Sequence, residues 1–574
     1  MSSTPLGGST AIRSPLLRPL PPAPSPSGGL VDRLLREQQS LTAVERFSRQ
    51  HDEGALPAQS RYYRHLIPLA RPAEGQQYAF EVDLDSCTGC KACVAACHSL
   101  NGLEETEIWR TVGLLHGGDA HAPAQRTVTT SCHHCVDPAC LNGCPVQAYE
   151  KDPVTGIVRH LDDQCIGCQY CTLMCPYDAP KYSKNLGIVR KCDMCSGRLA
   201  VGEAPACVQG CPNEAIKIRI VDKQQAIEAS EAGTFLPGAP TPEHTIPTTV
   251  YKGSRAAPSN LLPADFYGLS PENSHPPLVL LLVLTQLAAG AFAVTALVRW
   301  LFSLPATGDT ALAHAGFALA LGFAALGASV FHLGRPQGAW RAFLGLRTSW
   351  MSREALAFAM FAKAGAVYAA SLAAARWPGM PGAQVLAAAS GALQVATVAF
   401  GLLGVACSVM IYVATRRVQW TLAPVGAKFA GTTVLLGAAT VLLVSEVAGR
   451  WFPEGTGVHG SSGLRTFLLW TVLGASIAKL GLELSVFRHL RDQRHTVLKR
   501  VALLMKRDLA LVTRGRFLLG VWGGVLLPVG WLSGWFSGFS VALLIFVFSL
   551  LGELGERFLF FAAAPPSRMP GSLS

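Results

Sequence analysis

The sequence predicts two parts of different fold class: a cysteine-rich α+β domain, followed by an all-α bundle of eight membrane-spanning helices. Two observations lead to this prediction. Sixteen of the seventeen cysteines lie between Cys87 and Cys211 in four groups of four, and every long apolar stretch comes after Pro276. A chain of 574 residues has room for both parts. The polar half and the apolar half are therefore interpreted as separate domains.

Residues 1–75 are expected to form an N-terminal extension that is partly disordered. Residues 1–28 are rich in Pro, Ser and Gly, a composition typical of disordered segments. In residues 29–50 apolar side chains recur at helical spacing, which predicts a short amphipathic helix for local packing or for docking. Because residues 1–30 contain no continuous apolar core, no secretory signal is expected.

Residues 76–225 hold the four cysteine groups. The first and third groups share the spacing C-x2-C-x2-C-x3-C, and the second and fourth are looser variants of it. The groups are Cys87, Cys90, Cys93 and Cys97; Cys132, Cys135, Cys140 and Cys144; Cys165, Cys168, Cys171 and Cys175; and Cys192, Cys195, Cys207 and Cys211. Three thiolates packed so closely wrap one cubane iron–sulfur cluster, and the fourth reaches a neighbouring cluster. The pattern therefore predicts four [4Fe–4S] clusters, a path for single electrons.

Two other uses of clustered cysteines fit the spacing less well. Disulfides are disfavoured because no secretory signal precedes the groups. Zinc sites usually pair two C-x2-C knuckles at longer spacing, which does not explain four thiols in one short loop. Cys407, the remaining cysteine, lies in an apolar run and is interpreted as a small buried hydrophobe.

The cysteine groups form an internal repeat that is expected to fold like a pair of two-cluster ferredoxins. Groups one and four, and groups two and three, would then exchange their last cysteines. On this analogy Cys97 completes the fourth cluster and Cys211 the first, while Cys144 and Cys175 cross between the third and second. Strand-like segments flank the groups at 78–82, 157–160 and 216–220.

Residues 226–275 are rich in Pro, Gly, Ser and Thr and are expected to be a linker. Residues 276–563 then contain eight apolar stretches, each long enough to cross a bilayer, which takes about 20 residues. They lie near 276–303, 311–332, 354–374, 384–413, 424–446, 464–486, 513–533 and 538–560. The fourth is long and is expected to tilt or to extend past the interface.

Basic residues in the loops predict the orientation of the bundle. With eight spans, the loops after spans two, four and six lie on the N-terminal side. These loops hold Arg335, Arg341, Arg347, Arg416, Arg417, Arg488, Arg491, Arg494, Lys499, Arg500, Lys506 and Arg507. The positive-inside rule then places the cysteine-rich domain in the cytoplasm. Membrane topology also explains the net charge of +11, so no nucleic-acid partner is expected.

A membrane domain joined to iron–sulfur clusters is expected to exchange electrons with a quinone. A quinone site needs an apolar slot and groups that exchange protons with its oxygens. His332 ends span two and Glu354 opens span three, with Arg335, Arg341 and Arg353 nearby. Imidazole titrates near neutral pH and suits this exchange. Ionisable residues at span ends also anchor helices at the interface, and for the arginines that interpretation is equally good.

Charged residues deeper in the spans need partners. Glu483 lies one helical turn after Lys479, which predicts an ion pair between them. Glu553, Glu556 and Arg557 near the end of span eight predict either a structural network or a proton path.

The segment from Cys87 to Cys211, with CIGCQYCTLMCPYDAP and KCDMCSG, resembles the four-cluster electron-transfer subunit of dimethyl sulfoxide reductase-type molybdenum enzymes. Residues 276–561, with HLGRP, SWMSRE and GELGERFLFF, look like the eight-helix anchor subunit of the same enzymes. In that family the two are normally separate polypeptides, whereas here they are fused. The resemblance implies a multi-pass protein of the bacterial inner membrane and a separate molybdopterin-containing catalytic subunit. It also implies that His332 and Glu354 contact quinol.

Within this superfamily the stretches LTAVERFSRQHDEGALP (41–57) and YAFEVDLDSCTGCKACVAACHSLNG (78–102) look most similar to quinone-linked sulfite dehydrogenase. That likeness implies sulfite oxidation by the catalytic partner, with electrons flowing to the membrane quinone pool. Two alternatives stay open. The chain could serve a reductase for dimethyl sulfoxide or another S- or N-oxide, or it could be a membrane-bound ferredoxin without quinone chemistry.

Overall fold

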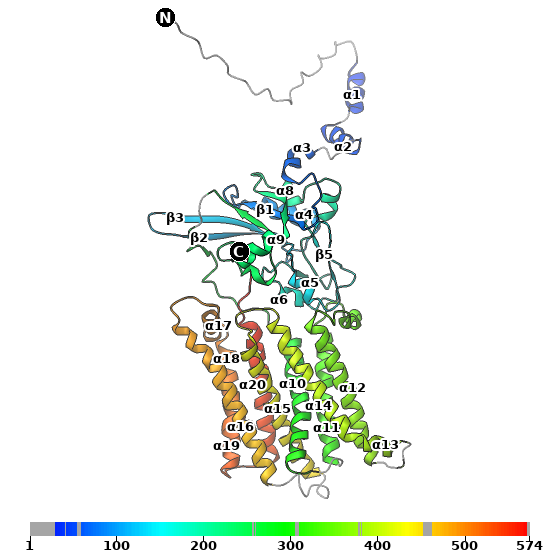
Figure 1. The fold of residues 1–574 in the computed structure, drawn as a ribbon, viewed down its shortest axis with the longest axis vertical. Helices are drawn as coiled ribbons and strands as arrows, with labels where there is room; N and C mark the ends of the chain where they lie inside the picture. Colours follow the sequence, from blue (N-terminus) through cyan, green and yellow to red (C-terminus); the bar gives the residue numbers. More distant parts are fainter. Residues whose placement is uncertain are drawn as a thin grey trace. The chain divides into compact units, whose positions relative to one another are not determined.

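The computed structural model describes residues 29–40, 42–53, 59–254, 258, 260–304, 309–376, 379, 382–451 and 462–570. The expected disorder of residues 1–28 lies outside them. The chain divides into two units, Met1–Arg61 and Tyr62–Ser574. The cysteine-rich domain (residues 62–275) and the membrane helices both belong to the second unit (Figure 1).

In the described part of the first unit, α1 (Leu30–Gln39) and α2 (Ala43–Glu53) precede the start of α3 (Ser60–Tyr63), where the sequence predicts one helix over residues 29–50. Thr42 begins the second helix with a capping box. The Thr42 Oγ1 accepts a hydrogen bond from the Glu45 backbone N–H at 3.2 Å, and the Glu45 carboxylate accepts one from the Thr42 N–H at 2.7 Å. This reciprocal cap satisfies helix-start donors and so favours a new helix over continuation of α1.

The main sheet of the cysteine-rich domain joins the two ends of the cysteine region. Its central strand β1 (Gln76–Asp83) pairs antiparallel with β8 (Ile216–Asp222) and parallel with β9 (Val250–Lys252). The strand-like segments expected at 78–82 and 216–220 therefore lie side by side. This pairing brings the first and last cysteine groups close together.

Hairpins and short helices fill the rest of this domain. The hairpins are β2 (Thr111–Gly118) with β3 (Pro123–Thr130), β4 (Tyr149–Lys151) with β5 (Val158–His160), and β6 (Lys181–Ser183) with β7 (Ile188–Arg190). Helices that carry cysteines are α4 (Ala92–Asn101), α5 (Ala139–Gly143), α6 (Tyr170–Met174) and α8 (Ala206–Gln209). The mixture of sheets and short helices around cysteine loops is the predicted α+β class.

Residues 226–275, predicted to be a linker, are part of the cysteine-rich domain. They contribute β9 to the main sheet, and β10 (Leu262–Pro263) pairs with β2. Helix α9 (Lys223–Glu231) begins at the Asp222 side chain, which accepts hydrogen bonds from two backbone N–H groups. Gly/Pro-rich composition marks irregular backbone; it does not exclude the short pairings seen here.

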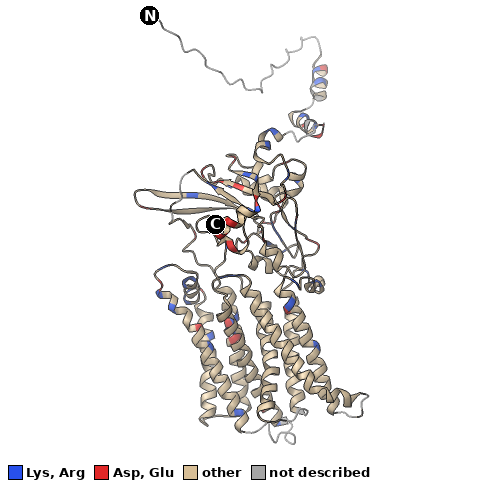
Figure 2. Ribbon diagram, viewed as in Figure 1, with Lys and Arg blue, Asp and Glu red and all other residues tan. Residues whose placement is uncertain are grey.

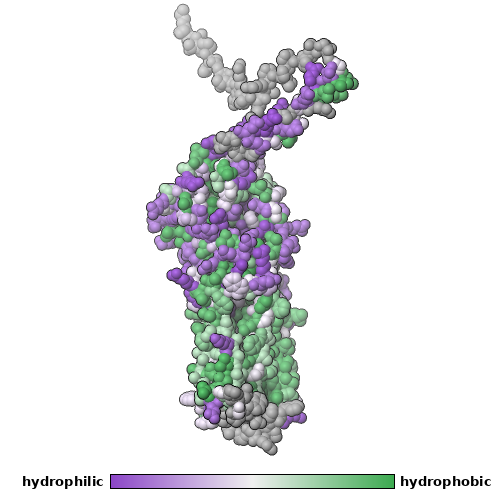
Figure 3. Space-filling model, turned by 90° about the vertical axis from the view of Figure 1, so that its right-hand side faces the viewer, coloured by the Kyte–Doolittle hydropathy of each residue, from purple (hydrophilic) through white to green (hydrophobic). Residues whose placement is uncertain are grey.

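The described residues contain eight helices long and apolar enough to cross a membrane, as predicted. They are α10 (Pro276–Leu301), α11 (Asp309–Val330), α12 (Trp350–Arg376), α14 (Ser390–Val413), α15 (Leu422–Trp451), α16 (Ser462–Leu484), the α18–α19 pair (Ala510–Val521 and Leu527–Leu532) and α20 (Phe539–Ala562). Figure 3 shows hydrophobic side chains covering the bundle, in contrast to the more polar cysteine-rich domain. Exposed aromatic residues lie near both ends of the spans, Trp340 at one and Trp300 and Trp535 at the other, as in membrane proteins.

Two spans depart from a single straight helix. The predicted fourth span divides into α13 (Ala383–Ala388) and α14, because 24 residues already suffice to cross a bilayer. The seventh contains a π-helical turn (Trp522–Leu526) just before Pro528. Proline lacks the N–H of a regular helix, so a local widening of the helix at this point is expected.

Helix packing in the bundle uses small residues. A Cβ on Gly290 of α10 would lie 1.9 Å from the carbonyl oxygen of Thr433 on α15, and one on Gly437 would lie 2.5 Å from the Gly290 backbone. The two helices therefore approach more closely than larger residues would allow, as is common in membranes.

The loop between α11 and α12 (residues 331–349) holds the cysteine-rich domain against the bundle. Its backbone donates to that domain twice, from Arg335 to the Ile166 carbonyl at 3.0 Å and from Gly345 to the Pro145 carbonyl at 2.8 Å. The C-terminal segment adds a second attachment, since the Ser567 hydroxyl donates to the Pro176 carbonyl at 3.0 Å. This segment lies beyond the predicted end of the anchor and was not predicted.

Candidate functional site

The fold gathers the cysteines into mixed sets that do not follow the sequence groups. Three cavities are each lined by three cysteines of one group and the last cysteine of another. The first site holds Cys87, Cys90, Cys93 and Cys211; the second holds Cys132, Cys135, Cys140 and Cys175; the fourth holds Cys192, Cys195, Cys207 and Cys97. This grouping is the crossed arrangement expected from the ferredoxin analogy.

The remaining four cysteines form the third site. Cys144 lies close enough to Cys168 and Cys171 for its negative thiolate to raise the pKa of both, after the larger effect of burial. Cys165 acts on Cys168 and Cys171 in the same way. The third site therefore joins Cys165, Cys168 and Cys171 to Cys144.

A repeated backbone turn shapes the cysteine loops. The residue just before the second cysteine of each group has a positive φ. These residues are Gly89 (φ 76°), His134 (φ 43°), Gly167 (φ 69°) and Met194 (φ 60°). Glycine adopts this left-handed conformation freely, and surrounding packing must enforce it at the buried His134 and Met194. The four cysteine groups, which repeat in sequence, therefore share the same backbone conformation at this position.

Buried donors without acceptors line two of the cavities. Within the described residues, Trp109 Nε1 and Arg110 Nε at the fourth site have no hydrogen-bond partner, and neither has His133 Nε2 at the second site, which is a donor in the tautomer whose Nδ1 accepts from the Thr249 hydroxyl. Unsatisfied buried polar groups are costly and need an explanation. The sulfur atoms of an iron–sulfur cluster would be acceptors for these N–H groups, so the cavities fit such a cluster.

Several of the buried thiols lie in environments that favour the protonated form, which a bound metal would oppose. Burial raises the pKa of the Cys97 thiol to about 12, with Cys207 adding to the shift. Iron ions bound by the thiolates would supply the positive charge that favours the ionised form.

His332 lies at the junction between the third site and the bundle. Its Nε2–H donates to the backbone carbonyl of Cys168 at 3.0 Å. Its ring meets that of His275 edge-on, with centroids 5.5 Å apart. Burial lowers the pKa of His332, and burial together with His332 lowers the pKa of His275 to about 4. Both imidazoles are therefore neutral at physiological pH.

His275 is a site residue that the sequence did not reveal. It stands at the end of the expected linker and caps α10 in a left-handed conformation (φ 46°). A single histidine after a Ser-rich stretch carries no pattern. Only the tertiary structure places it against His332.

Glu354 is buried in α12, where its carboxylate accepts a hydrogen bond from the Ser408 hydroxyl of α14. The cysteine-rich domain reaches the same region through Tyr170, whose hydroxyl donates to the Ile411 carbonyl at 2.8 Å. His332 lies at the start of the loop of residues 331–349, which contacts the third site, and Glu354 lies in the helix that follows this loop.

The arginines near His332 bind the cysteine-rich domain. Arg335 donates to the carbonyls of Leu186 at 3.2 Å and Asp162 at 2.9 Å, and Arg341 donates to the Asp163 carbonyl at 2.5 Å. Arg353 of α12 instead donates to the carbonyls of Leu346 and Arg347 in the preceding loop. The predicted role of Arg335 in binding quinone stays a prediction, since its hydrogen bonds in the structure join the two domains.

Charged side chains inside the bundle gather toward the end nearer the cysteine-rich domain (Figure 2). Lys479 contacts Glu553 at 2.5 Å, and Arg516 holds both Glu483 at 2.7 Å and Glu553 at 3.0 Å. The predicted ion pair of Lys479 with Glu483 is therefore wrong, because both partners find stronger contacts across helices. Arg516 was not predicted.

Glu556 extends this network and lines a cavity together with Lys428 and Glu483. Its carboxylate lies 3.3 Å from Lys428 and 3.4 Å from Arg557. Together the contacts tie α15, α16, α18 and α20 to one another. This geometry favours the structural interpretation over a proton path across the whole bundle.

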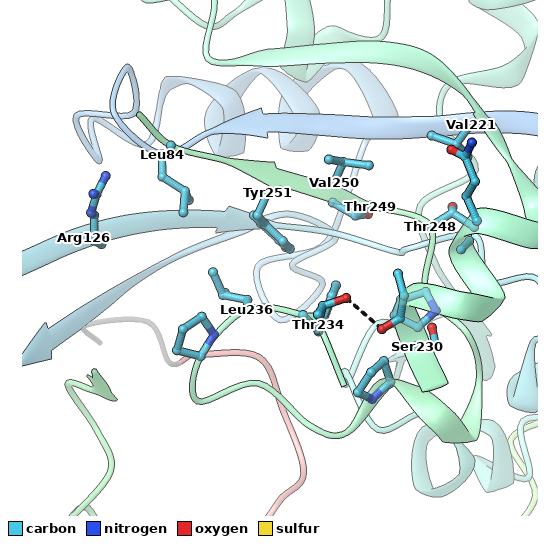
Figure 4. Close-up of a pocket in the computed structure, with 18 of the residues that line it drawn as sticks. Leu84, Arg126, Val221, Ser230, Thr234, Leu236, Thr248, Thr249, Val250 and Tyr251 are labelled. Carbon is cyan, nitrogen blue, oxygen red and sulfur yellow. Dashed lines mark hydrogen bonds between the residues drawn. The ribbon is translucent and has the colours of Figure 1, made fainter. Parts of the chain in front are cut away.

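A larger cavity, of about 590 Å³, lies in the cysteine-rich domain, and no cysteine is among its described lining residues (Figure 4). Its walls come mainly from α9, β9 and the segments between them, and Tyr251 projects into it from β9. The described lining is mostly apolar, with Arg126 and Asp222 as its charged members. None of the predicted site residues is among them.

The buried cysteines and the eight apolar helices define a class of protein, a membrane-anchored iron–sulfur electron-transfer protein. Comparisons with known proteins agree for both parts. Residues 124–220 match the 4Fe-4S dicluster domain, and residues 272–561 match the DMSO reductase anchor subunit (DmsC). The second match covers half of the chain, and the chain belongs to this family.

The curated relatives match the cysteine-rich part. The B subunit of the anaerobic dimethyl sulfoxide reductase of Haemophilus influenzae is 35% identical over 191 residues, which cover 32% of this chain and 92% of the relative. The corresponding B subunit from Escherichia coli is 38% identical over 26% of this chain and 75% of its own length. The formate dehydrogenase-O iron-sulfur subunit of Escherichia coli is 34% identical over 26% of this chain and 55% of its own length.

Proposed function

We propose that this chain passes electrons between a molybdopterin-containing catalytic subunit and the membrane quinone pool, through four [4Fe–4S] clusters held by the sixteen cysteines. The observation that carries the proposal is the hydrogen bond from His332 to Cys168. It joins a proton-exchanging side chain at the membrane boundary to a ligand loop of the third site. Electron transfer and proton transfer then meet in one place.

The contacts between sites support one order of carriers. The crossed cysteines couple the first site to the fourth and the second to the third. Cys192 of the fourth site lies close to Cys132 of the second. Burial raises the pKa of the Cys192 thiol, and the nearby Cys132 thiolate raises it further. The order is then first, fourth, second, third, with the third next to the bundle. Cys90 of the first site is exposed, which suits contact with a catalytic partner at the opposite end.

Reduction of a quinone to quinol takes up two electrons and two protons, and oxidation releases them. His332 and Glu354 are the groups proposed to exchange these protons with the two quinone oxygens. The buried Glu354 keeps its position through Ser408, and His332 keeps its orientation through the Cys168 carbonyl. The neutral imidazole of His332 can accept a proton on Nδ1 while Nε2–H stays bonded to the carbonyl.

For the substrate we propose sulfite, which the partner oxidises to sulfate with an oxygen atom from water and with release of two electrons and two protons. Support comes from the likeness of residues 41–57 and 78–102 to quinone-linked sulfite dehydrogenase. The basic loops support a cytoplasmic position of the cysteine-rich domain, where such an oxidation would take place. The relatives that are subunits of dimethyl sulfoxide reductases favour the second candidate, reduction of an S- or N-oxide with electrons from quinol.

The test uses the complex purified from native membranes through a tag on this chain. Sulfite-dependent reduction of a soluble ubiquinone analogue is the expected activity. Its absence, in a preparation that contains molybdenum and about sixteen irons (four cubanes of four), rules out sulfite. Quinol-dependent reduction of dimethyl sulfoxide in the same preparation would establish the second candidate. A preparation that has the iron but exchanges no electrons with quinones contradicts the quinone site itself.

A further inference from the structure

Arg110 is a fully buried cation between the first and fourth sites. It is 2% exposed, and its guanidinium lies over the ring of Phe80 at 4.7 Å. It donates to the hydroxyls of Thr129 at 3.2 Å and Ser131 at 2.9 Å. Thr129 in turn lies 3.5 Å from the sulfur of Cys93, a ligand of the first site. Arg110 also lines the cavity of the fourth site.

Lys191 occupies the same kind of position between the fourth and second sites. It is 2% exposed and lines the cavity of the second site. Its ammonium donates to the backbone carbonyl of Cys192, a ligand of the fourth site, at 2.9 Å, and to that of Val158. Both cations therefore lie beside the fourth site.

Neither cation has a carboxylate among its hydrogen-bond or ion-pair partners in the described part of the chain. An unpaired buried charge is costly. Burial lowers the pKa of Arg110, but the thiolates of Cys207 and Cys93 outweigh burial and raise it overall. Lys191 directly precedes Cys192 of the fourth site and lines the cavity that holds Cys132 and Cys140 of the second. The counter-charges of both cations are therefore the cysteine sites themselves.

We propose that Arg110 and Lys191 are fixed charges that each raise the reduction potentials of two neighbouring clusters, Arg110 at the first and fourth sites and Lys191 at the second and fourth. A cubane with four thiolate ligands is an anion, and its negative charge grows when it takes up an electron. A cation held nearby in a medium of low dielectric constant stabilises the reduced form. The described hydrogen bonds and cavity linings that place the two cations involve the first, second and fourth sites, so no shift is expected at the third.

This inference rests on the four-cluster ligation proposed above. It can be tested without knowing which electron paramagnetic resonance signal belongs to which cluster. Arg110→Met is expected to lower two of the four cluster potentials, and Lys191→Met is expected to lower two. The two pairs share one cluster, the fourth. One cluster, the third, keeps its potential in both variants.

The experiment is a redox titration of the purified complex, followed by electron paramagnetic resonance. Arg110→Lys and Lys191→Arg keep the charge and are expected to leave all four potentials near the parent values. Arg198→Met is the matched control, because Arg198 lies near Cys195 but is paired with Glu203 at 3.0 Å. Its removal is expected to shift the potentials less than removal of Arg110.

Several outcomes would overturn the inference. Unchanged potentials in both methionine variants would show that the charges do not act on the clusters. A uniform shift of all four potentials, or two pairs without a common member, would show that they act differently from the geometry described. Arg110→Gln, which keeps donors for Thr129 and Ser131, replaces Arg110→Met if the latter loses iron. Iron content and the number of signals are measured first, so that failure of the four-cluster proposal is recognised separately.

Discussion

The imidazole of His332 and the backbone of Cys168 are joined by a hydrogen bond of 3.0 Å. They are 164 residues apart in sequence, and the bond connects the loop after α11 with the third cysteine site.

His332→Ala is expected to leave the clusters intact and to reduce quinone turnover on the order of 100-fold, because a positioned general acid–base group is lost. Stopped-flow measurement of quinone reduction, with iron analysis, checks this. His489→Ala, a histidine bonded to Asp492 on the same side, is the control. Unchanged turnover in His332→Ala would count against the site.

The crossed grouping of cysteines predicts which variants affect the same cluster. Cys144→Ser and Cys168→Ser are expected to alter the same signal, although they belong to different sequence groups. Cys175→Ser is expected to alter a different one, together with Cys140→Ser. The measurement is the electron paramagnetic resonance spectrum of each reduced variant. If Cys144→Ser and Cys140→Ser altered the same cluster, the grouping would be wrong.

Gly334 has no room for a side chain where the two domains meet. A Cβ there would lie 2.1 Å from the carbonyl oxygen of Gly187. Gly334→Ala is therefore expected to destabilise the protein by about 1–3 kcal/mol, the usual range for overpacking. Thermal unfolding of the detergent-solubilised protein checks it. Gly327→Ala on α11, where a Cβ meets nothing within 4 Å, is expected to have little effect and is the matched control. Equal stability of the two variants would contradict the tight contact.

The ion pair of Lys479 with Glu553 is expected to stabilise the bundle. Glu553→Gln leaves Lys479 and Arg516 without a shared counter-charge, which is expected to cost about 3–5 kcal/mol. Glu446→Gln removes the more exposed pair with Arg465 and is expected to cost about 0–1 kcal/mol. Unfolding midpoints in one detergent give the comparison. A Glu553→Gln variant of parental stability but without quinone turnover would favour the proton-path interpretation instead.

His275 predicts a pH dependence of stability. Its pKa in the folded protein is about 4, lowered by burial and by His332, whereas an unfolded histidine titrates near about 6.5. Between these values the unfolded chain binds more protons, so stability rises with pH. The contribution is fully present above about pH 6.5 and is lost as the pH falls toward 4.

The check compares unfolding midpoints at about pH 7.5 and about pH 5.5, on either side of the histidine value. The His275→Gln variant lacks the titrating group and is expected to lose less stability on acidification than the parent. The same loss in both proteins would mean that another group causes the pH dependence.

Local patterns determined much of this protein. The spacing of the cysteines predicted the loops of each group, and apolar length predicted all eight helices to within a few residues, since both depend on neighbours in sequence. Even the crossed exchange of Cys144 and Cys175 followed from the internal repeat by analogy. The loops and the helices arise from local chain geometry, whereas the exchange of Cys144 and Cys175 joins separate segments and was inferred only from the ferredoxin analogy.

Other features depend on contacts between distant segments, and only the tertiary structure decided them. The sequence paired Lys479 with Glu483, its neighbour on one helix, whereas packing brought Glu553 from another helix closer. His275, Arg110 and Arg516 stand in no motif, and their partners come from elsewhere in the chain. A buried charge takes whichever counter-charge the packed fold brings within reach. The length of an apolar stretch predicts a membrane-spanning helix. It does not predict which faces of two helices pack together, and therefore it does not predict which charged residues pair.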